Sequence, residues 1–167
     1  MGLDITAYEQ LLEPFTGDIE SLTDEERDDI YDDHYCMWKN PDFPNHAADI
    51  EYEYYKDRVG AFRFCAGSYS GYDNWRNWLA TIAGYQSADY VWSNITEGPF
   101  FELINFSDCE GTIGPAYSAK LYKDFVDHQH IVDQISDDDY SAVRNKDLYN
   151  KWKEAFKVGS TGAVSFH

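Results

Sequence analysis

The sequence predicts one α+β domain over residues 1–167, with an antiparallel or mixed sheet and about three helices. A chain of 167 residues has the size of a single domain. Hydrophobic residues make up 43% and aromatic residues 17% of it, which is enough to build a core although the net charge is −18. Segments of period-two alternation are mixed with segments of helical spacing, and no P-loop, GxGxxG motif or domain-separating linker interrupts them.

Period-two alternation predicts the strands. Residues 3–11 alternate apolar and polar side chains and begin the sheet. Residues 99–106 (PFFELINF) are the most convincing strand because they are almost entirely apolar. The remaining strands are predicted at residues 34–40, 50–55, 61–67 and 162–167, and the second and third of these are predicted to pair with each other.

Helical spacing predicts three helices, at about residues 73–84, 115–132 and 139–157. Gly84 is a stop signal for the first helix, and Pro115 suits the first position of the second. The predicted inward stripes are Trp75, Trp78, Leu79 and Ile82 in the first helix, Leu121, Phe125 and Val126 or Gln129 in the second, and Tyr140, Val143, Leu148, Trp152 and Phe156 in the third.

Residues 17–34 form an acidic segment with nine acids and one arginine, a net charge of −8. The first 57 residues hold 17 acids and 3 bases, which is −14 of the total −18, so we expect one charged pole rather than a uniform coat. Thr23 and Glu26 fit a capping box and predict a helix start there. Ile30 is the only aliphatic residue of positions 23–34, so such a helix has little to bury. We expect this surface to be extended by some of Asp42, Asp49, Glu51, Glu53 and Asp57.

Composition and spacing argue against several functional classes. The negative charge disfavours direct binding to nucleic acid or to membranes and favours basic partners. The first residues lack a signal-peptide pattern and no apolar run reaches membrane length, which predicts a cytoplasmic protein. Cys36, Cys65 and Cys109 form no CxxC pair, and His128 and His130 face different sides of a helix, so no metal site and no cofactor is predicted. The acidic segment also lacks the glycine and glutamate spacing of an EF-hand.

Two turns offer a candidate ligand site. Residues 66–76 (AGSYSGYDNWR) lead from a predicted strand into a helix and would present backbone N–H groups to an anion. Residues 105–115 (NFSDCEGTIGP) also follow a predicted strand and place carboxylates at a sheet edge. A thiol between two acids is a poor nucleophile, so no catalytic role is assigned to Cys109. No other residue is assigned a catalytic role either. The structural alternative is that these serines and Asp108 cap helices and the glycines relieve strain. The candidate ligand-binding residues are Ser68, Tyr69, Ser70, Tyr72, Trp75, Arg76, Asp108 and Glu110.

Four blocks, MGLDITAY, GSYSGYDNWR, PFFELINFSDCEGTIGP and GAVSFH, resemble a group of small proteins encoded by phages and prophages. The resemblance runs over most of the chain through these blocks and brings no catalytic residues. It implies a context, since small accessory phage proteins often act on host machinery, including defence systems, inside the infected bacterium. The acidic segment lies outside the four blocks.

Two functional hypotheses follow. In the first, the protein is a phage-encoded inhibitor that presents its acidic segment as a nucleic-acid mimic to a basic surface of a host nucleic-acid-binding or defence protein. As a helix the segment would carry one charge per ~3.4 Å, close to the phosphate spacing of one DNA strand. Plain solvation is the alternative explanation of the charge. The partner-binding residues are then Asp24, Glu25, Glu26, Asp28, Asp29, Asp32 and Asp33.

In the second hypothesis, the two turns form a pocket for a nucleotide-like small ligand, or the site of an enzyme. The sequence offers neither a nucleophile nor metal ligands for such an enzyme, and the negative field opposes phosphate substrates. The sequence therefore favours the first, non-enzymatic role.

Overall fold

The structure, a computed structural model, describes residues 2–107 and 111–167. It is a single α+β unit with a five-stranded sheet in the order β2-β3-β1-β5-β4, in which every neighbouring pair is antiparallel. The predicted fold class is thus confirmed, with the antiparallel alternative realised. The strands are β1 (Leu3–Pro14), β2 (Tyr35–Cys36), β3 (Tyr54–Gly67), β4 (Gly111–Ile113) and β5 (Ala163–Phe166).

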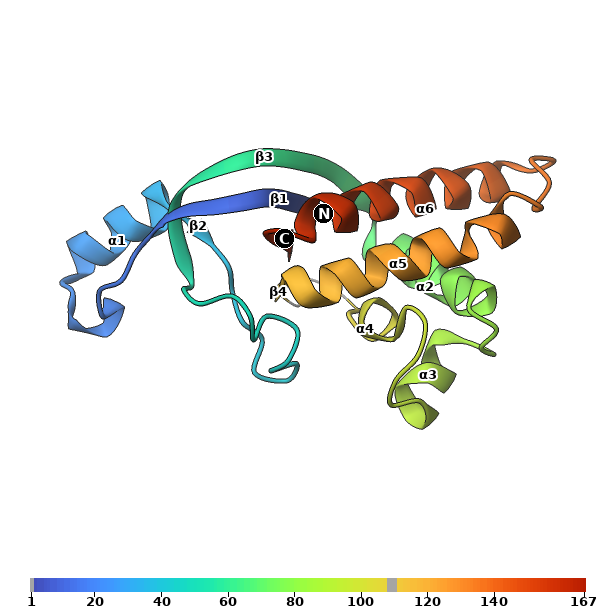
Figure 1. The fold of residues 1–167 in the computed structure, drawn as a ribbon, viewed down its shortest axis with the longest axis horizontal. Coiled ribbons are helices and arrows are strands. Elements are labelled where there is room, and N and C mark those ends of the chain that lie inside the picture. The colour runs from blue at the N-terminus through green and yellow to red at the C-terminus, as the bar shows by residue number, and fades with distance from the viewer. Residues whose placement is uncertain (1, 108–110) are drawn as a thin grey trace.

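The two long strands β1 and β3 form an arch that reaches away from the helices (Figure 1). They pair along nearly their whole length, from Leu3 opposite Gly67 to Pro14 opposite Tyr55. Gly60 has a φ of 58° in the middle of β3, a conformation that glycine adopts without steric cost and that bends a strand. The arch carries the acidic helix at its far end.

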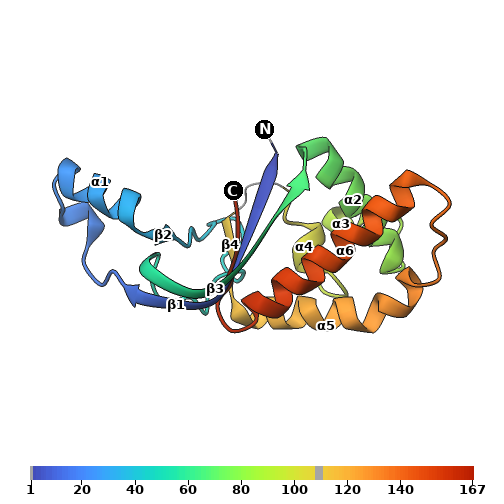
Figure 2. The same cartoon turned by 90° about the horizontal axis from the view of Figure 1, so that it is seen from above.

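The described residues contain six α-helices rather than about three. The two longest, α5 and α6, lie against the sheet, and α2 to α4 pack beyond them (Figures 1 and 2). The additional helices are α1 at the end of the arch and two short helices in segments where the sequence predicts a connection or a strand. The helices are α1 (Asp24–Asp33), α2 (Tyr69–Ile82), α3 (Ala88–Asn94), α4 (Phe101–Ile104), α5 (Pro115–Val132) and α6 (Tyr140–Gly159), with a 3-10 turn at Ile19–Ser21.

An aromatic stack forms the centre of the core. The Trp152 ring of α6 lies stacked on Tyr72 and Trp75 of α2, with ring centroids 5.7 Å apart in both pairs. Phe156, one turn further along α6, also stacks on Trp152, with ring centroids 5.6 Å apart. All four rings are buried, so burial of aromatic area holds α2 against α6.

The strand prediction at residues 99–106 is wrong. This segment contains the helix α4, and five of its residues from Glu102 to Phe106 are buried. A short apolar run that is buried on all sides has no period, so apolarity alone cannot separate a strand from a helix. Phe100 enters α4 in the left-handed region with a φ of 56°, and its N–H donates to Asp124.

The other strand predictions are partly confirmed: residues 61–67 lie in β3, but the predicted pairing and some bounds are wrong. Residues 50–55 and 61–67 do not pair with each other, because residues 54–67 form one continuous strand that pairs with β1. Within residues 34–40 only Tyr35 and Cys36 pair, with Tyr55 and Tyr54. The predicted first strand and closing strand are confirmed as β1 and β5, which lie side by side.

The predicted helix positions agree with α2, α5 and α6, but some inward residues do not. Leu121 and Phe125 are buried as predicted, but Val126 is 50% exposed and the stripe continues to Val132. Tyr140 is 84% exposed and Val143 is also exposed, because the first turns of α6 extend past the core. α2 begins at Tyr69, four residues before the predicted start, because Ser68 already caps it.

Candidate functional site

The start of α1 is fixed by a capping box, as the sequence predicts. The Thr23 hydroxyl accepts a hydrogen bond from the Glu26 N–H at 3.3 Å, and the Glu26 carboxylate accepts one from the Thr23 N–H at 2.9 Å. The Thr23 hydroxyl also donates to the Glu26 carboxylate at 2.8 Å. The two hydrogen bonds that the carboxylate accepts from Thr23 favour its ionised form and lower the pKa of Glu26. Glu26 therefore serves the helix itself, although it was predicted to bind a partner.

The other six acids of α1 occupy one face of the helix. They lie at positions i, i+1, i+4, i+5, i+8 and i+9, and all six are exposed. The opposite face carries Arg27, Ile30 and His34, which are half-buried, and no residue of α1 is buried. We call these six the acidic face: Asp24, Glu25, Asp28, Asp29, Asp32 and Asp33.

Few contacts neutralise or hold this face. Within residues 17–34, all of which the structure describes, the one ion pair joins Arg27 to Asp24 at 3.1 Å, and the Asp24 side chain is 98% exposed. Such an exposed pair contributes little to stability. α1 contacts the arch through Tyr31, whose ring centroid lies 5.8 Å from that of Tyr54 in β3. The acidic segment is α-helical only over Asp24–Asp33, less than the whole of residues 17–34.

The acids expected to extend this surface have mixed roles. Asp49 accepts a hydrogen bond from the Ala116 N–H at 2.6 Å and so caps α5 rather than facing α1. Glu53 lies at the start of β3 beside Cys36, whose thiol is 3.9 Å from its carboxylate. Asp57 accepts from the Arg58 N–H at 2.8 Å and is exposed on the arch.

The predicted ligand-binding residues of the 66–76 turn are largely used by the fold. The Ser68 hydroxyl caps α2 by accepting from the Gly71 N–H at 3.1 Å, and the Ser70 hydroxyl lies 3.3 Å from it. Tyr72 is buried and its hydroxyl donates to the Phe106 carbonyl at 2.9 Å. Trp75 is also buried, and its indole N–H donates to the Asn145 carbonyl at 3.2 Å. Tyr72 and Trp75 therefore face the core and cannot stack on a ligand at the surface.

Part of the predicted pairing of the two turns is present. Arg76 donates to the Ile104 carbonyl at 2.5 Å and pairs with Asp73 at 2.6 Å. It lines a small cavity of about 250 Å³ together with Asn105 and Ser107 of the second turn. Tyr69, the first residue of α2, is exposed. Asp108, Cys109 and Glu110 lie outside the described residues.

A larger cavity lies on the face of the sheet that points away from the helices. Its volume is about 750 Å³, within the range of small-molecule sites. Of the predicted ligand-binding residues that the structure describes, from Ser68 to Arg76, none lines it. We call it the sheet-face cavity, and it is lined by Asp4, Ile5, Thr6, Tyr8, His34, Tyr35, Cys36, Trp38, Arg63, Phe64, Cys65, Gly111, Thr112, Ser165, Phe166 and His167.

Strand register gathers the polar floor of this cavity. Thr6 stands opposite Arg63 of β3 and Ser165 of β5, and Ser165 stands opposite Thr112 of β4. Directly paired residues share a face, so these four side chains form one row across four strands. The Thr112 and Ser165 hydroxyls are 3.2 Å apart. Asp4 lies in the neighbouring row, and its backbone exchanges hydrogen bonds of 2.9 and 3.0 Å with His167.

The segment that follows α1 forms the wall of the cavity. It passes beneath the β1–β3 arch (Figure 1) and brings His34, Tyr35 and Trp38 to the cavity. Trp38 lies tightly against Gly111, because a Cβ atom there would come within 2.7 Å of the Trp38 carbonyl oxygen and 2.9 Å of its indole ring. The Nδ1 atom of His34 is buried without a hydrogen-bond partner.

Burial shifts the pKa values of several lining groups. It lowers the pKa of His167, and the positive charge of Arg63 lowers it further, so this imidazole is neutral at pH 7. Burial raises the pKa of the Cys36 thiol, and Glu53 adds to that effect, which keeps Cys36 protonated and unreactive. Burial also raises the pKa of Tyr8. Among the described residues no group of three or more acids, histidines and cysteines could hold a metal ion. The lining therefore offers hydrogen-bonding, charged and aromatic groups to a ligand.

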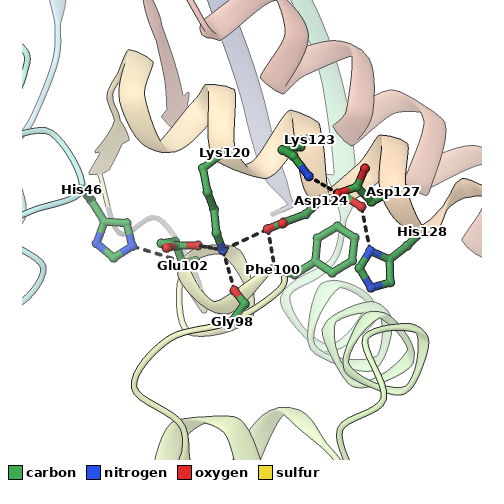
Figure 3. A network of polar contacts seen from close by, with 9 residues as sticks. All are labelled: His46, Gly98, Phe100, Glu102, Lys120, Lys123, Asp124, Asp127 and His128. Carbon is green, nitrogen blue, oxygen red and sulfur yellow. Dashed lines mark hydrogen bonds and ion pairs between the residues drawn. The ribbon is translucent and has the colours of Figure 1, made fainter.

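A buried polar network between α4 and α5 has a structural role (Figure 3). The Lys120 ammonium lies 2.6 Å from a Glu102 oxygen, 2.9 Å from an Asp124 oxygen and 2.5 Å from the Gly98 carbonyl oxygen. The same Asp124 oxygen accepts the Phe100 N–H at 2.8 Å. Each of these charges is paired within the fold, so the network fastens the loop before α4 to α5.

The sequence carried one signal for the sheet-face cavity. In the predicted strands at residues 3–11, 61–67 and 162–167, the alternate positions that do not face the core are occupied by Thr6, Arg63, Cys65 and Ser165. Their presence on one face follows from the alternation, but their meeting depends on strand order and on the crossing segment after α1. Neither can be derived from the local pattern.

Comparison of the chain with protein-family models, with curated proteins and with solved structures finds no match. None of the helices in the described part of the chain is long and apolar enough to cross a membrane.

Proposed function

We propose that the protein is an interaction protein that inhibits a basic partner by presenting α1 to it as a nucleic-acid-like negative surface. One observation supports the proposal most directly: six carboxylates share one exposed face of a helix in which no side chain is buried. Core packing does not require this helix. Its acidic face is turned outward, where only a partner or solvent can meet it.

The arrangement of the acidic face is unfavourable for the isolated chain. The six acids form two rows at spacing i, i+4, and like charges at that spacing repel each other. A surface that serves only solubility usually mixes both signs. The retained repulsion supports a role in binding, because a basic partner would relieve it.

The charge density suits the proposed mimicry. Ten helical residues span ~15 Å, so six outward carboxylates give one charge per ~2.5 Å. This value lies between the ~3.4 Å spacing of one DNA strand and the ~1.7 Å spacing of both strands together. The resemblance to phage-encoded proteins leads us to propose a host nucleic-acid-binding protein, such as a defence protein, as the partner.

The test compares three forms of the tagged protein in pull-downs from the bacterial host. They are the wild type, a variant without the charges of the acidic face (the arm-neutral variant) and a charge-matched control. The arm-neutral variant replaces the acidic face by Asp→Asn and Glu→Gln. The control removes six other carboxylate charges from the helical part of the molecule, outside α1, at Asp89, Glu97, Asp127, Asp138, Asp147 and Glu154. We expect a partner that is retained by the wild type and the control and lost from the arm-neutral variant.

The identified partner then allows a quantitative test with purified proteins. Binding should weaken steeply between roughly 50 and 200 mM salt and should be competed by the partner's own DNA or RNA, because the same basic groups serve both ligands. Equal affinity of the wild type and the arm-neutral variant, or binding that is insensitive to salt, would show that the acidic face is only a solubility device.

A further inference from the structure

We propose that the sheet-face cavity binds a nucleoside monophosphate, with the base between aromatic side chains of the wall, the phosphate at Arg63 and the sugar over the polar floor. This site is separate from the acidic face and does not depend on the proposed interaction with a basic protein. It also differs from the predicted site between the two turns, because the residues of the 66–76 turn do not line it.

The size and position of the cavity suit a ligand of this kind. A volume of about 750 Å³ accommodates a mononucleotide together with some water. The opposite face of the sheet packs its side chains, such as Ile5, Phe64 and Phe166, into the core. The cavity face instead carries hydroxyl and charged groups that no helix covers. Asp4 and Arg63 are exposed there, whereas the hydroxyl groups of the floor are almost wholly buried.

The wall offers a place for a planar base. Trp38 is 44% exposed although its backbone and indole ring are held against Gly111, so a fixed aromatic surface faces the cavity. Base–aromatic stacking of this kind tolerates any base because every base has a π-face. His34 stands in the same wall and adds a second planar ring to the lining.

Arg63 offers a place for the phosphate. It forms no ion pair within residues 2–107 and 111–167, and its side chain is exposed at the cavity. A guanidinium binds phosphate oxygens in a bidentate manner. It is the one arginine or lysine of the lining, while the whole chain carries −18, so a monophosphate is favoured over a triphosphate.

The floor offers partners for sugar hydroxyls. Thr6, Thr112 and Ser165 hold their hydroxyl groups in this floor at only 2–6% exposure. The Thr112 and Ser165 hydroxyls are 3.2 Å apart and Ser165 lies 3.6 Å from the Met37 sulfur, so only part of their hydrogen-bonding capacity is left for a sugar hydroxyl. Asp4, in the next row, has an exposed carboxylate, and carboxylates bind ribose hydroxyls in nucleotide sites. The three kinds of group are thus arranged within one cavity in the combination that a nucleotide requires.

The test titrates the full-length protein with AMP, GMP, CMP and UMP by calorimetry, and in parallel with adenosine and with inorganic phosphate. We expect saturable binding of at least one mononucleotide with a dissociation constant below about 1 mM. The corresponding nucleoside should bind about tenfold more weakly, because it lacks the charged hydrogen bonds of the phosphate. Saturable binding of none of the mononucleotides, or equal binding of phosphate alone, would overturn the proposal.

Matched variants locate the site. Arg63→Met should weaken the mononucleotide about tenfold and leave the nucleoside unchanged, whereas Trp38→Ala should weaken both. The controls are Arg144→Met on α6 and Trp92→Ala on α3, two exposed residues that do not line the cavity, and neither should change binding. Loss of binding in a control but not in its partner variant would place the ligand elsewhere and overturn the assignment.

A second measurement avoids substitution altogether. Cys65 lines the cavity and is exposed, so a bound nucleotide should slow its alkylation by iodoacetamide in the wild-type protein. Mass spectrometry of the Cys65 peptide gives the rates with and without the nucleotide. Unchanged rates at a saturating nucleotide concentration would also overturn the proposal, even if Trp38→Ala fails to fold.

Discussion

Lys120 of α5 holds its ammonium group 2.6 Å from the carboxylate of Glu102 in α4, a residue that is only 8% exposed. The two residues join a four-residue helix to an eighteen-residue one. α4 is too short to be stable alone, since isolated helices need far more than one turn. Its position therefore depends on this pair and on the Lys120 contacts with Asp124 and Gly98.

Lys120→Met should destabilise the protein by about 2–3 kcal/mol, because it leaves the buried Glu102 carboxylate without its partner. Urea unfolding followed by tryptophan fluorescence measures the loss. The control is Lys151→Met, which removes an exposed pair with Asp147 and should cost less than about 0.5 kcal/mol. Equal losses in the two variants would contradict the structural role of the network.

Tyr72→Phe should cost about 1–2 kcal/mol of unfolding free energy, because it leaves the buried Phe106 carbonyl without the hydroxyl that donates to it. Tyr140→Phe, at an exposed position, is the control and should have no effect. Tyr72→Phe should leave the affinity of the sheet-face cavity for its ligand unchanged. A stable Tyr72→Phe protein with altered ligand affinity would restore the predicted site at the 66–76 turn.

Asp49→Ala should cost about 1 kcal/mol, the usual effect of losing a helix N-cap. Gly114, the residue at the N-cap position of α5, makes no side-chain hydrogen bond, and Asp49 supplies the missing acceptor from a distant loop. Asp42→Ala removes an exposed acid of the same loop and serves as the matched control. Chemical denaturation of both variants decides whether the acid at position 49 stabilises α5.

Stability should fall as the pH drops below about 6.5, and His46 should account for part of the fall. Burial lowers the pKa of His46 in the folded protein below its ordinary value of 6.5. Near pH 6.5 the imidazole is therefore protonated in the unfolded chain but not in the folded chain. The free energy of unfolding consequently decreases as the pH falls, and the folded protein becomes less stable. His46→Gln should show a smaller decrease between pH 7.5 and 5.5 in urea titrations. An identical slope in both proteins would show that other groups, such as His167, carry the effect.

Signals that act within a few residues were read correctly from the sequence. The capping box of Thr23 and Glu26 and the start of α5 at Pro115 depend only on local geometry, and both are confirmed. The helix count failed where local signals were weak. α4 lies in an apolar run without a period, and α3 is a seven-residue helix capped by Ser87.

The sheet-face cavity could not be predicted for a different reason. Its lining comes from five separate stretches of the chain, around Asp4, His34, Arg63, Gly111 and Ser165. Their assembly depends on β1 lying between β3 and β5 and on the segment after α1 crossing under the arch. Both arrangements belong to the tertiary fold, and the spacing of residues within one stretch does not predict them.

The place of β1 in the sheet also has a consequence for how the protein is made. β1 pairs with β3 early in the chain, but its other edge pairs with β5, and Thr161 donates to the Glu9 carbonyl across 152 positions. A ribosome that adds ~5–20 residues per second needs roughly 5–20 s to pass from the end of β3 to β5. During that time one edge of β1 remains unpaired, and open strand edges recruit other strands. The nascent chain thus passes through an aggregation-prone state that ends only when residues 163–166 leave the ribosome.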